Sequence, residues 1–217
     1  TVSIGIDVGT VSAKLACVGP QALLAPLDEC GPLQLRRLDT GDDTDHAVYI
    51  AAPRRTRGQP QAVVLELLDE LAQCLPPDTS CHITCTGSGS ALLAHNLGAE
   101  TCNEFQAATR GVSRLHPAAR TIFEIGGENS RYIRCEPDPS SGRLGIVDYG
   151  SNGDCAAGTG TFLDQQAGRL QIEVEQIAAA VGEADRAAQI AGRCSVFAKS
   201  DMIHAQQKGF APPEVLR

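Results

Sequence analysis

The chain has 217 residues, of which 42% are hydrophobic and 20% are charged, and its formal net charge is −8. This length allows one large domain or two small ones, and the acidic balance argues against nucleic acid or an anionic membrane as the main partner. Aromatic residues make up only 4%, which argues against base stacking. No apolar run has transmembrane length and no signal peptide is recognisable, so we expect a reducing, cytoplasmic location for a chain with nine cysteines.

The first half of the chain alternates between strand-like and helix-like patterns. Short apolar runs bounded by turn residues predict strands, and apolar residues at helical spacing predict helices. In chain order we expect strands at 2–7 and 14–18, an irregular segment at 20–47, a strand at 48–52, a helix at 61–75, a strand and turn at 82–90, and helices at 90–97 and 103–115.

The second half restarts the pattern. We expect strands at 121–127, 130–136 and 144–149, followed by helices at 156–170, 173–181, 183–191 and 199–207, the last ended by Gly209 and two prolines. The order of strand, glycine turn and strand therefore occurs twice, at 2–18 and at 121–136. This weak internal repeat predicts two similar halves.

The segment GIDVGTVSAK (5–14) carries polar residues at the end of the first strand. Asp7 ends the strand and Gly9 allows a tight turn. Hydrogen-bond donors follow at Thr10, Ser12 and Lys14. The arrangement suits a hydrated Mg²⁺ near the carboxylate and phosphate oxygens within the hairpin. It is not a Walker A loop, because the G-K-[ST] ending and the helix behind it are missing, and an isolated match of this kind is most often a plain β-hairpin.

The segment EIGGENSR (124–131) repeats this design. Glu124 ends a strand, Gly126 and Gly127 form the turn, and Asn129 and Arg131 follow. Two such hairpins in one chain are much harder to obtain by accident than one, so the pair favours phosphate binding.

The segment NGDCAAGTGTFLDQQ (152–166) runs from a glycine-rich stretch into a predicted helix. Such helix entries commonly bind anions through free backbone N–H groups and the positive end of the helix dipole. Cys155 is open to four interpretations there: a packed small residue, a bystander in a phosphate loop, a nucleophile or a metal ligand. By contrast, Cys17, Cys81, Cys85 and Cys135 lie in apolar runs, where we expect small buried side chains.

These segments together resemble a known family. The two hairpins resemble the phosphate loops of the actin-like ATPase superfamily. Within this superfamily, one branch is resembled most: the BadF/BadG/BcrA/BcrD ATPase family, through the segments NGDCAAGTGTFLDQQ (152–166) and GRCSVFAKSDMI (192–203). Its members are the activators of 2-hydroxyacyl-CoA dehydratases and benzoyl-CoA reductases. The segments look most like those of the large multidomain members. The resemblance implies an α/β chain with the actin-like (ribonuclease H-like) fold and two similar subdomains with mixed sheets, at 1–118 and 119–217. The second is expected to be partial, because the chain stops before the region that supplies the adenosine pocket.

The same resemblance implies an ATP-dependent electron-transfer activator. Cys155, expected at a helix N-terminus, and Cys194 would bind a [4Fe–4S] cluster shared with a second copy, since two cysteines cannot fill a Cys₄ site and a homodimer supplies four. Ferredoxin or flavodoxin would donate the electron under anaerobic conditions. A dehydratase or related iron–sulfur reductase would receive it, with ATP hydrolysis driving the transfer.

The remaining site residues also come from the resemblance. Catalysis is expected from Asp7 and from Glu104, which would orient the attacking water. ATP and Mg²⁺ are expected to be bound by Gly9, Thr10, Ser12, Lys14, Glu124, Gly126, Gly127 and Asn129.

The chain also departs from the family pattern. The family usually has aspartate at the positions of Glu124 and Asn129, lysine at that of Arg131, and histidine at that of Ala108. These departures favour a non-hydrolysing regulatory module of a larger protein as one alternative. A sugar-kinase-like phosphotransferase, which would not require the cysteine pair, is the other.

Overall fold

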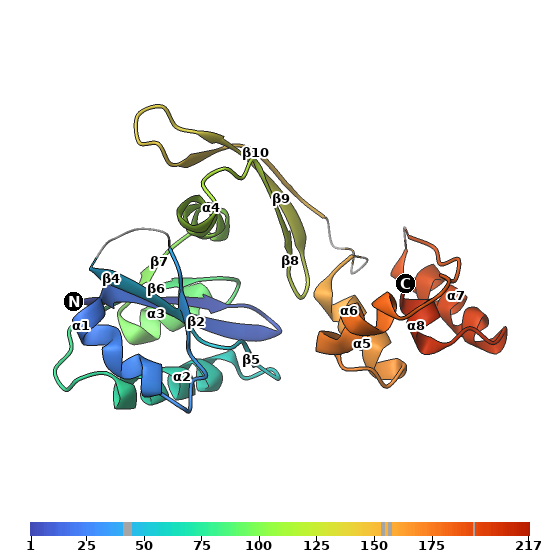
Figure 1. Ribbon diagram of the computed structural model, residues 1–217, viewed down its shortest axis with the longest axis horizontal. Helices are drawn as coiled ribbons and strands as arrows, with labels where there is room; N and C mark the ends of the chain where they lie inside the picture. The colour runs from blue at the N-terminus through green and yellow to red at the C-terminus, as the bar shows by residue number, and fades with distance from the viewer. Residues whose placement is uncertain (41–44, 153–154, 156–157, 193) are drawn as a thin grey trace. The chain divides into compact units, whose positions relative to one another are not determined.

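The computed structural model describes residues 1–40, 45–152, 155, 158–192 and 194–217 (Figure 1). The chain divides into two compact units. The first unit comprises residues 1–122 and 133–149, and the second comprises 123–132 and 150–217. The subdomain boundary expected between residues 118 and 119 stays a prediction. Among the helices of the described residues, none is both long and apolar enough to cross a membrane.

The first unit is built on a mixed sheet. Its strands are β1 (Val2–Val8), β2 (Ser12–Pro20), β3 (Arg36–Leu38), β4 (His46–Ile50), β5 (Arg54–Arg55), β6 (Cys81–Thr86) and β7 (Glu100–Thr101). They follow the order β3-β4-β2-β1-β6-β7, with β5 paired to β2. Strand β1 pairs antiparallel with β2 and parallel with β6, so the sheet combines a hairpin with a crossover connection.

Helices cover both faces of this sheet (Figure 1). They are α1 (Gln21–Leu24), the 3₁₀ helix η1 (Ala25–Glu29), α2 (Pro60–Cys74), α3 (Ser90–Leu97) and α4 (Glu104–Leu115). On α2 the predicted helical period is confirmed, because Val64, Leu67 and Leu71 are fully buried in the core against β1. Helix α4 lies over the opposite face, the face that also carries Asp7 and Lys14 (Figure 1).

A three-stranded antiparallel sheet supplies segments to both units. Its strands are β8 (Thr121–Ile125), β9 (Ser130–Pro137) and β10 (Leu144–Ser151), in the order β10-β9-β8. Alternate residues of β9, Ile133 and Cys135, are buried, as period-two patterning requires.

The second unit is helical beyond these strands. Its elements are α5 (Gly160–Arg169), the 3₁₀ helix η2 (Val174–Gln176), α6 (Ile177–Gly182), α7 (Ser195–Gln207) and α8 (Pro212–Leu216). A small core of Leu170, Met202, Ala205 and Val215 holds them together. Three expectations were wrong: the segment 20–47 is not irregular, because it contains α1, η1 and β3; α7 begins at Ser195 and not at 199; and residues 183–191 form no helix. The helix expected from 156 is α5, which begins at Gly160, and residues 156–157 lie outside the described residues.

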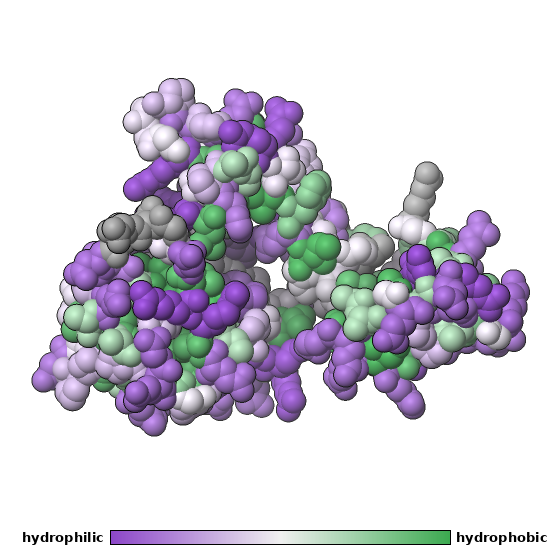
Figure 2. Space-filling view, in the orientation of Figure 1, coloured by the Kyte–Doolittle hydropathy of each residue, from purple (hydrophilic) through white to green (hydrophobic). Residues whose placement is uncertain are grey.

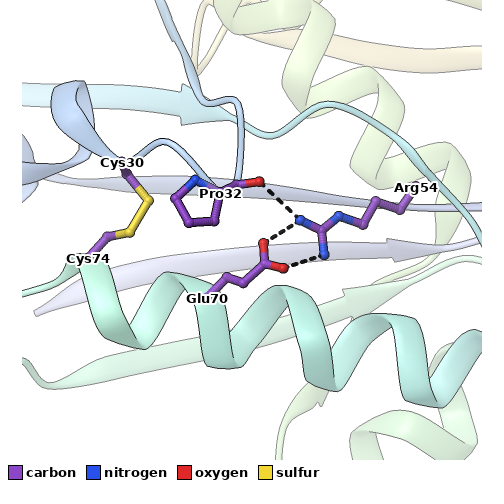
Figure 3. The surroundings of a disulfide bond; sticks show 5 residues. All are labelled: Cys30, Pro32, Arg54, Glu70 and Cys74. Carbon is purple, nitrogen blue, oxygen red and sulfur yellow. Dashed lines mark hydrogen bonds and ion pairs between the residues drawn. A yellow bond between two sulfur atoms is a disulfide. The ribbon is translucent and has the colours of Figure 1, made fainter.

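The cysteines differ from expectation in two respects. Cys30 and Cys74 form a disulfide that joins the end of η1 to the end of α2, where reduced thiols were expected (Figure 3). Cys81 is exposed and not buried, whereas Cys17, Cys85 and Cys135 are buried as predicted. Burial raises the pKa of the Cys17 thiol to about 12, so this side chain is an inert part of the core.

Candidate functional site

The first predicted phosphate hairpin is the β1–β2 turn of the first unit. Asp7 and Lys14 face each other in the strand register, and the Lys14 ammonium donates to the Asp7 carboxylate at 2.7 Å. Both side chains are about half exposed, at 40% for Asp7 and 48% for Lys14. An acid and a base are therefore held together at one surface position, where a phosphate could take the lysine and a hydrated cation the carboxylate.

The turn itself is fixed by a residue that sequence reasoning missed. Within the turn, the Gly9 N–H donates to the Ser12 carbonyl at 3.0 Å. From outside it, the Thr56 hydroxyl donates to the Thr10 carbonyl at 2.6 Å, and the Thr56 N–H donates to the Val11 carbonyl at 2.9 Å. Thr56 is only 1% exposed. The hairpin loop therefore has a defined shape before any ligand binds.

A second missed feature is the glycine turn after β6. Gly87 has φ +94°, and a Cβ added there would lie 2.5 Å from the Val8 carbonyl oxygen and 2.7 Å from the Asp7 carboxylate. The Gly89 N–H donates to the Val8 carbonyl at 3.0 Å. Only glycine combines this backbone conformation with such close approach, so this turn holds the end of β1 and its carboxylate in place.

A cavity of about 630 Å³ lies on the Asp7 face of the sheet. Its lining includes Asp7, Lys14, Thr84, Thr86 and Ala107 of α4. Among the described residues, the buried Thr86 hydroxyl has no hydrogen-bond partner. An orphaned hydroxyl beside an ion pair fits a cavity that takes a polar ligand.

Glu104 belongs to the first turn of α4. The Asn103 side chain caps this helix, accepting from the N–H of Phe105 at 2.9 Å and that of Gln106 at 3.4 Å. The helix N-terminus also stabilises the negative charge of Glu104. Asp7, Lys14 and Glu104 are thus all part of the first unit.

The second predicted phosphate hairpin is the β8–β9 turn of the second unit. The Gly126 N–H donates to the Asn129 carbonyl at 2.8 Å, which closes the turn. At its base, Arg131 lies 3.6 Å from the Glu124 carboxylate. The hairpin therefore repeats the acid and base pair of the first one, with arginine in place of lysine.

This hairpin is bonded directly to the cysteine segment. The N–H of Gly160, at the start of α5, donates to the Gly126 carbonyl at 2.8 Å, and the Thr161 N–H donates to the Gly127 carbonyl at 2.9 Å. A Cβ on Gly160 would lie 3.1 Å from the Gly126 carbonyl oxygen, so glycine permits this close contact. The second hairpin and the N-terminus of α5 therefore form one hydrogen-bonded structure.

Asn152 adds a bridge that sequence reasoning missed. Its side-chain oxygen accepts from the Ser130 N–H at 2.8 Å, and its amide nitrogen donates to the Cys155 carbonyl at 2.8 Å. Its own N–H donates to the Ser130 carbonyl at 2.9 Å. The Ser130 hydroxyl also donates to the Gly158 carbonyl. A movement of the hairpin at Ser130 would therefore be transmitted to the backbone of Cys155.

The two candidate ligand cysteines occupy different positions from those expected. Cys155 is an exposed free thiol in the loop before α5, not at the helix N-terminus, because Thr159 is the N-cap. Cys194, half buried, is the residue that holds an N-cap position, that of α7. The motif positions at 153–154, 156–157 and 193 lie outside the described residues.

Next to Cys194, two large apolar side chains lie at the surface: Val196 is 68% exposed and Phe197 is 66% exposed. Within the described part of the chain, no three histidine, cysteine or acidic side chains gather as a metal site. Cys155 and Cys194 are both free thiols of the second unit, and two exposed apolar side chains follow Cys194 in the sequence.

Comparisons with known proteins identify the family of the chain. The model of the BadF/BadG/BcrA/BcrD ATPase family matches residues 4–217. The uncharacterised protein YjiL of Escherichia coli (strain K12) is 30% identical over 186 residues, covering 82% of this chain and 69% of that protein. The activator of lactoyl-CoA dehydratase from Anaerotignum propionicum is 32% identical over 115 residues, covering 53% of this chain and 42% of that protein. The chain thus matches less than half the length of that activator.

A solved structure supports the fold. The activator of the 2-hydroxyisocaproyl-CoA dehydratase from Clostridium difficile, with bound ADPNP, superposes with a TM-score of 0.68 at 22% identity, covering 100% of this chain and 69% of that one. This likeness, with the mixed sheet and the separate antiparallel sheet, confirms the predicted α/β actin-like ATPase fold.

Proposed function

This chain belongs to the BadF/BadG/BcrA/BcrD ATPase family, and on that basis we propose that it is an ATP-dependent activator that delivers a low-potential electron to a partner enzyme. The partner class is a 2-hydroxyacyl-CoA dehydratase or a related iron–sulfur reductase, by analogy with the Anaerotignum propionicum relative, the activator of lactoyl-CoA dehydratase. Ferredoxin or flavodoxin is the proposed donor.

Nucleotide binding is assigned to the two hairpins. Lys14 and the backbone of Gly9, Thr10 and Ser12 would hold phosphate oxygens, while Asp7 would hold a hydrated Mg²⁺. Support comes from the fixed shape of the hairpin, which Thr56 and Gly87 impose before any ligand binds. Glu104 would orient the water that attacks the terminal phosphate.

In the second hairpin, the backbone of Gly126 and Gly127 would contact phosphate, and Glu124 and Asn129 would complete the site. Arg131 holds Glu124 in an ion pair at 3.6 Å. A phosphate arriving at this turn would compete for Arg131, which gives the hairpin a way to respond to the nucleotide.

Cys155 and Cys194 are proposed to bind half of a [4Fe–4S] cluster, with two more thiolates from a second copy. The bound cluster would supply a one-electron carrier. The protein contributes two free thiols, and one of them, Cys194, occupies the N-cap position of α7. The exposed Val196 and Phe197 beside Cys194 would supply apolar surface for the second copy.

One observation carries this proposal: the Cys155 loop and the second hairpin share hydrogen bonds through Asn152 and through Gly160 and Thr161. An activator must make the electron-transfer state depend on the nucleotide, and a ligand shifts an equilibrium only through differential contacts. The shared bonds provide a physical connection through which phosphate contacts could alter the position of Cys155.

The test is an electron paramagnetic resonance titration of the anaerobically purified, reduced protein. We expect a signal from a one-electron-reduced cluster whose shape changes on replacing ADP by a non-hydrolysable ATP analogue, together with ATP hydrolysis. Cys155→Ala and Cys194→Ala should abolish the signal, whereas Cys81→Ala, a change at another exposed free cysteine, should leave it intact.

Other results would select the alternatives. An iron-free protein that phosphorylates a sugar would replace the proposal by the phosphotransferase alternative. A protein that binds ATP, hydrolyses none and carries no iron would be a regulatory module.

A further inference from the structure

A second cavity lies in the first unit, and none of its lining residues belongs to either predicted phosphate hairpin. Its volume is about 580 Å³, and it is formed between α4 and the turn that joins β9 to β10. Helix α4 and the residues after it contribute Arg110, Ser113, Arg114 and Pro117, and the hairpin contributes 141–144. All of these residues belong to the first unit, and many hydrophilic side chains cover this part of its surface (Figure 2). We call it the α4–hairpin groove.

The groove concentrates positive charge in an acidic protein. The whole chain has a net charge of −8, yet three arginines, Arg110, Arg114 and Arg143, line this cavity without any lining carboxylate. Within the part of the chain that the structure describes, the Arg110 and Arg143 guanidinium groups form no hydrogen bond or ion pair. Both side chains are exposed, and two guanidinium groups without a partner among the described residues leave capacity for an external anion.

The acid that lies nearest along the hairpin is already engaged. Asp138 accepts from the Ser140 N–H at 2.9 Å, from the Ser140 hydroxyl at 2.8 Å and from the Ser141 hydroxyl at 2.8 Å. These donors hold the pKa of Asp138 below its ordinary value. Its carboxylate oxygens are therefore occupied by donors of the turn itself.

The walls of the groove are fixed by the fold. The Leu144 N–H donates to the Ser113 hydroxyl at 2.9 Å, which ties the hairpin to α4. The turn is closed by the Asp138 N–H donating to the Arg143 carbonyl at 2.7 Å and the Gly142 N–H donating to the Asp138 carbonyl at 2.8 Å. The groove is thus preorganised, which lowers the entropic cost of binding.

A smaller cavity of about 280 Å³ continues the groove along α4. Arg110 and Leu144 line both cavities, and Gln106, Thr109 and Ile146 complete the smaller one. Thr109 is only 3% exposed, and its hydroxyl has no partner among the described residues. A buried unpaired hydroxyl costs free energy unless a ligand or water pairs with it, so this second, independent feature also indicates a binding site.

We propose that the α4–hairpin groove binds a small organic phosphate. The arginines would take the phosphate oxygens, since the guanidinium fork matches them in bidentate geometry. Pro117, Leu144 and Ile146 would contact the apolar part of the molecule, and the volume of the larger cavity, about 580 Å³, falls in the range of small-molecule sites. This site shares no residue with the two hairpins, so it is separate from the proposed ATP site.

Isothermal titration calorimetry on the full chain tests the proposal, with phenyl phosphate and inorganic phosphate as probes. Excess MgADP is present throughout so that the phosphate hairpins are occupied. We expect one phenyl phosphate site, with weaker binding of inorganic phosphate because it lacks the apolar contacts. The double variant Arg110→Gln/Arg143→Gln should weaken phenyl phosphate binding by about tenfold or more, since charge-assisted hydrogen bonds are lost.

Arg134→Gln is the single-charge control, because it removes one positive charge from the exposed face of β9 outside the groove, and it should bind normally. No measurable binding, or equal binding by the double variant, would overturn the proposal. So would a loss of binding in Lys14→Gln instead, which would assign the phosphate to the first hairpin. Tighter binding of a glutamate-rich peptide at the same arginines would overturn the ligand class in favour of an acidic protein partner.

Discussion

Replacing Asn152 by alanine tests the link between the second hairpin and the cysteine segment. The change removes a side chain that accepts from the Ser130 N–H and donates to the Cys155 carbonyl, each at 2.8 Å. The backbone bond between the Asn152 N–H and the Ser130 carbonyl, at 2.9 Å, does not depend on the side chain. The variant therefore weakens the link without deleting the segment.

The expected magnitude follows from those two bonds. A neutral hydrogen bond contributes about 1 kcal/mol net, and a part-buried donor left without an acceptor costs about 1–3 kcal/mol. The Ser130 N–H becomes such a donor in the variant. We therefore expect the local opening free energy to fall by roughly 2 kcal/mol, which is about a thirtyfold faster exchange of the amides that depend on this contact.

Native-state hydrogen exchange measures this effect at the Ser130 and Asn152 amides. The control is Asn96→Ala, which changes an exposed asparagine on α3 in the first unit and should leave both amides unchanged. In the unchanged protein, a non-hydrolysable ATP analogue should slow exchange at both amides, and this response should be smaller in Asn152→Ala. Identical exchange in the variant and the unchanged protein would refute the idea that Asn152 couples the two segments.

Three further predictions concern the first unit. Gly87→Ala should lower the free energy of unfolding by about 2–4 kcal/mol, because Gly87 has φ +94° and the added Cβ would meet the Val8 carbonyl. Gly111→Ala, at a helical position of α4 with open space around it, should raise the free energy of unfolding by up to about 1 kcal/mol. Urea unfolding distinguishes the two variants, and equal effects would contradict the role assigned to Gly87. Reducing the Cys30–Cys74 disulfide should lower the free energy of unfolding by about 4 kcal/mol, from the loop-entropy estimate for a separation of 44 residues. The double variant Cys30→Ala/Cys74→Ala, which lacks the bond, is the reductant-insensitive control, and an unfolding midpoint of the unchanged protein that does not move with reductant would show that the bond contributes nothing. Arg54 holds the pKa of Glu70 below its usual value, so the stabilisation from this ion pair is present above about pH 4.5 and is lost as the pH falls through the lowered pKa (Figure 3). Glu70→Gln should therefore lower the free energy of unfolding by about 1 kcal/mol at pH 7, and this difference should vanish in acid. A difference that does not depend on pH would exclude the ion pair as its cause.

Local patterns were enough to predict much of the fold. The helical period of 61–75 became α2, and Asn103 was correctly included at the start of α4, where it is the N-cap. The two hairpins at Asp7 and Glu124 also formed, because an acid, a glycine turn and alternating apolar residues are sufficient to specify such a turn.

Local patterns failed where tertiary contacts decide. Thr56 holds the first hairpin from 46 residues away, and Cys30 finds Cys74 across 44 residues, and neither partner can be deduced from spacing. The segment after Cys194 contains valine and phenylalanine, which have modest helix propensity. Their propensity therefore did not indicate that α7 begins as early as Ser195. The helix expected to end before Gly209 and the two prolines does end there, at Gln207, but the short helix α8 that begins at Pro212 was not expected.

The candidate site shows the same division. The motif residues were identified from the sequence, whereas Asn152 and Ser130, which connect the second hairpin to Cys155, were not. Their only signal was an Asn–Gly pair just before the cysteine, which by itself indicates no more than a turn.

The central claim is that Cys155 and Cys194 of two copies share one cluster, and native mass spectrometry under anaerobic conditions tests it most directly. We expect a species with the mass of two chains plus one [4Fe–4S] cluster, about four irons in all. Either Cys155→Ala or Cys194→Ala should remove the cluster mass, and Cys81→Ala should retain it. A single chain carrying a complete cluster, or a dimer without iron, would contradict the account.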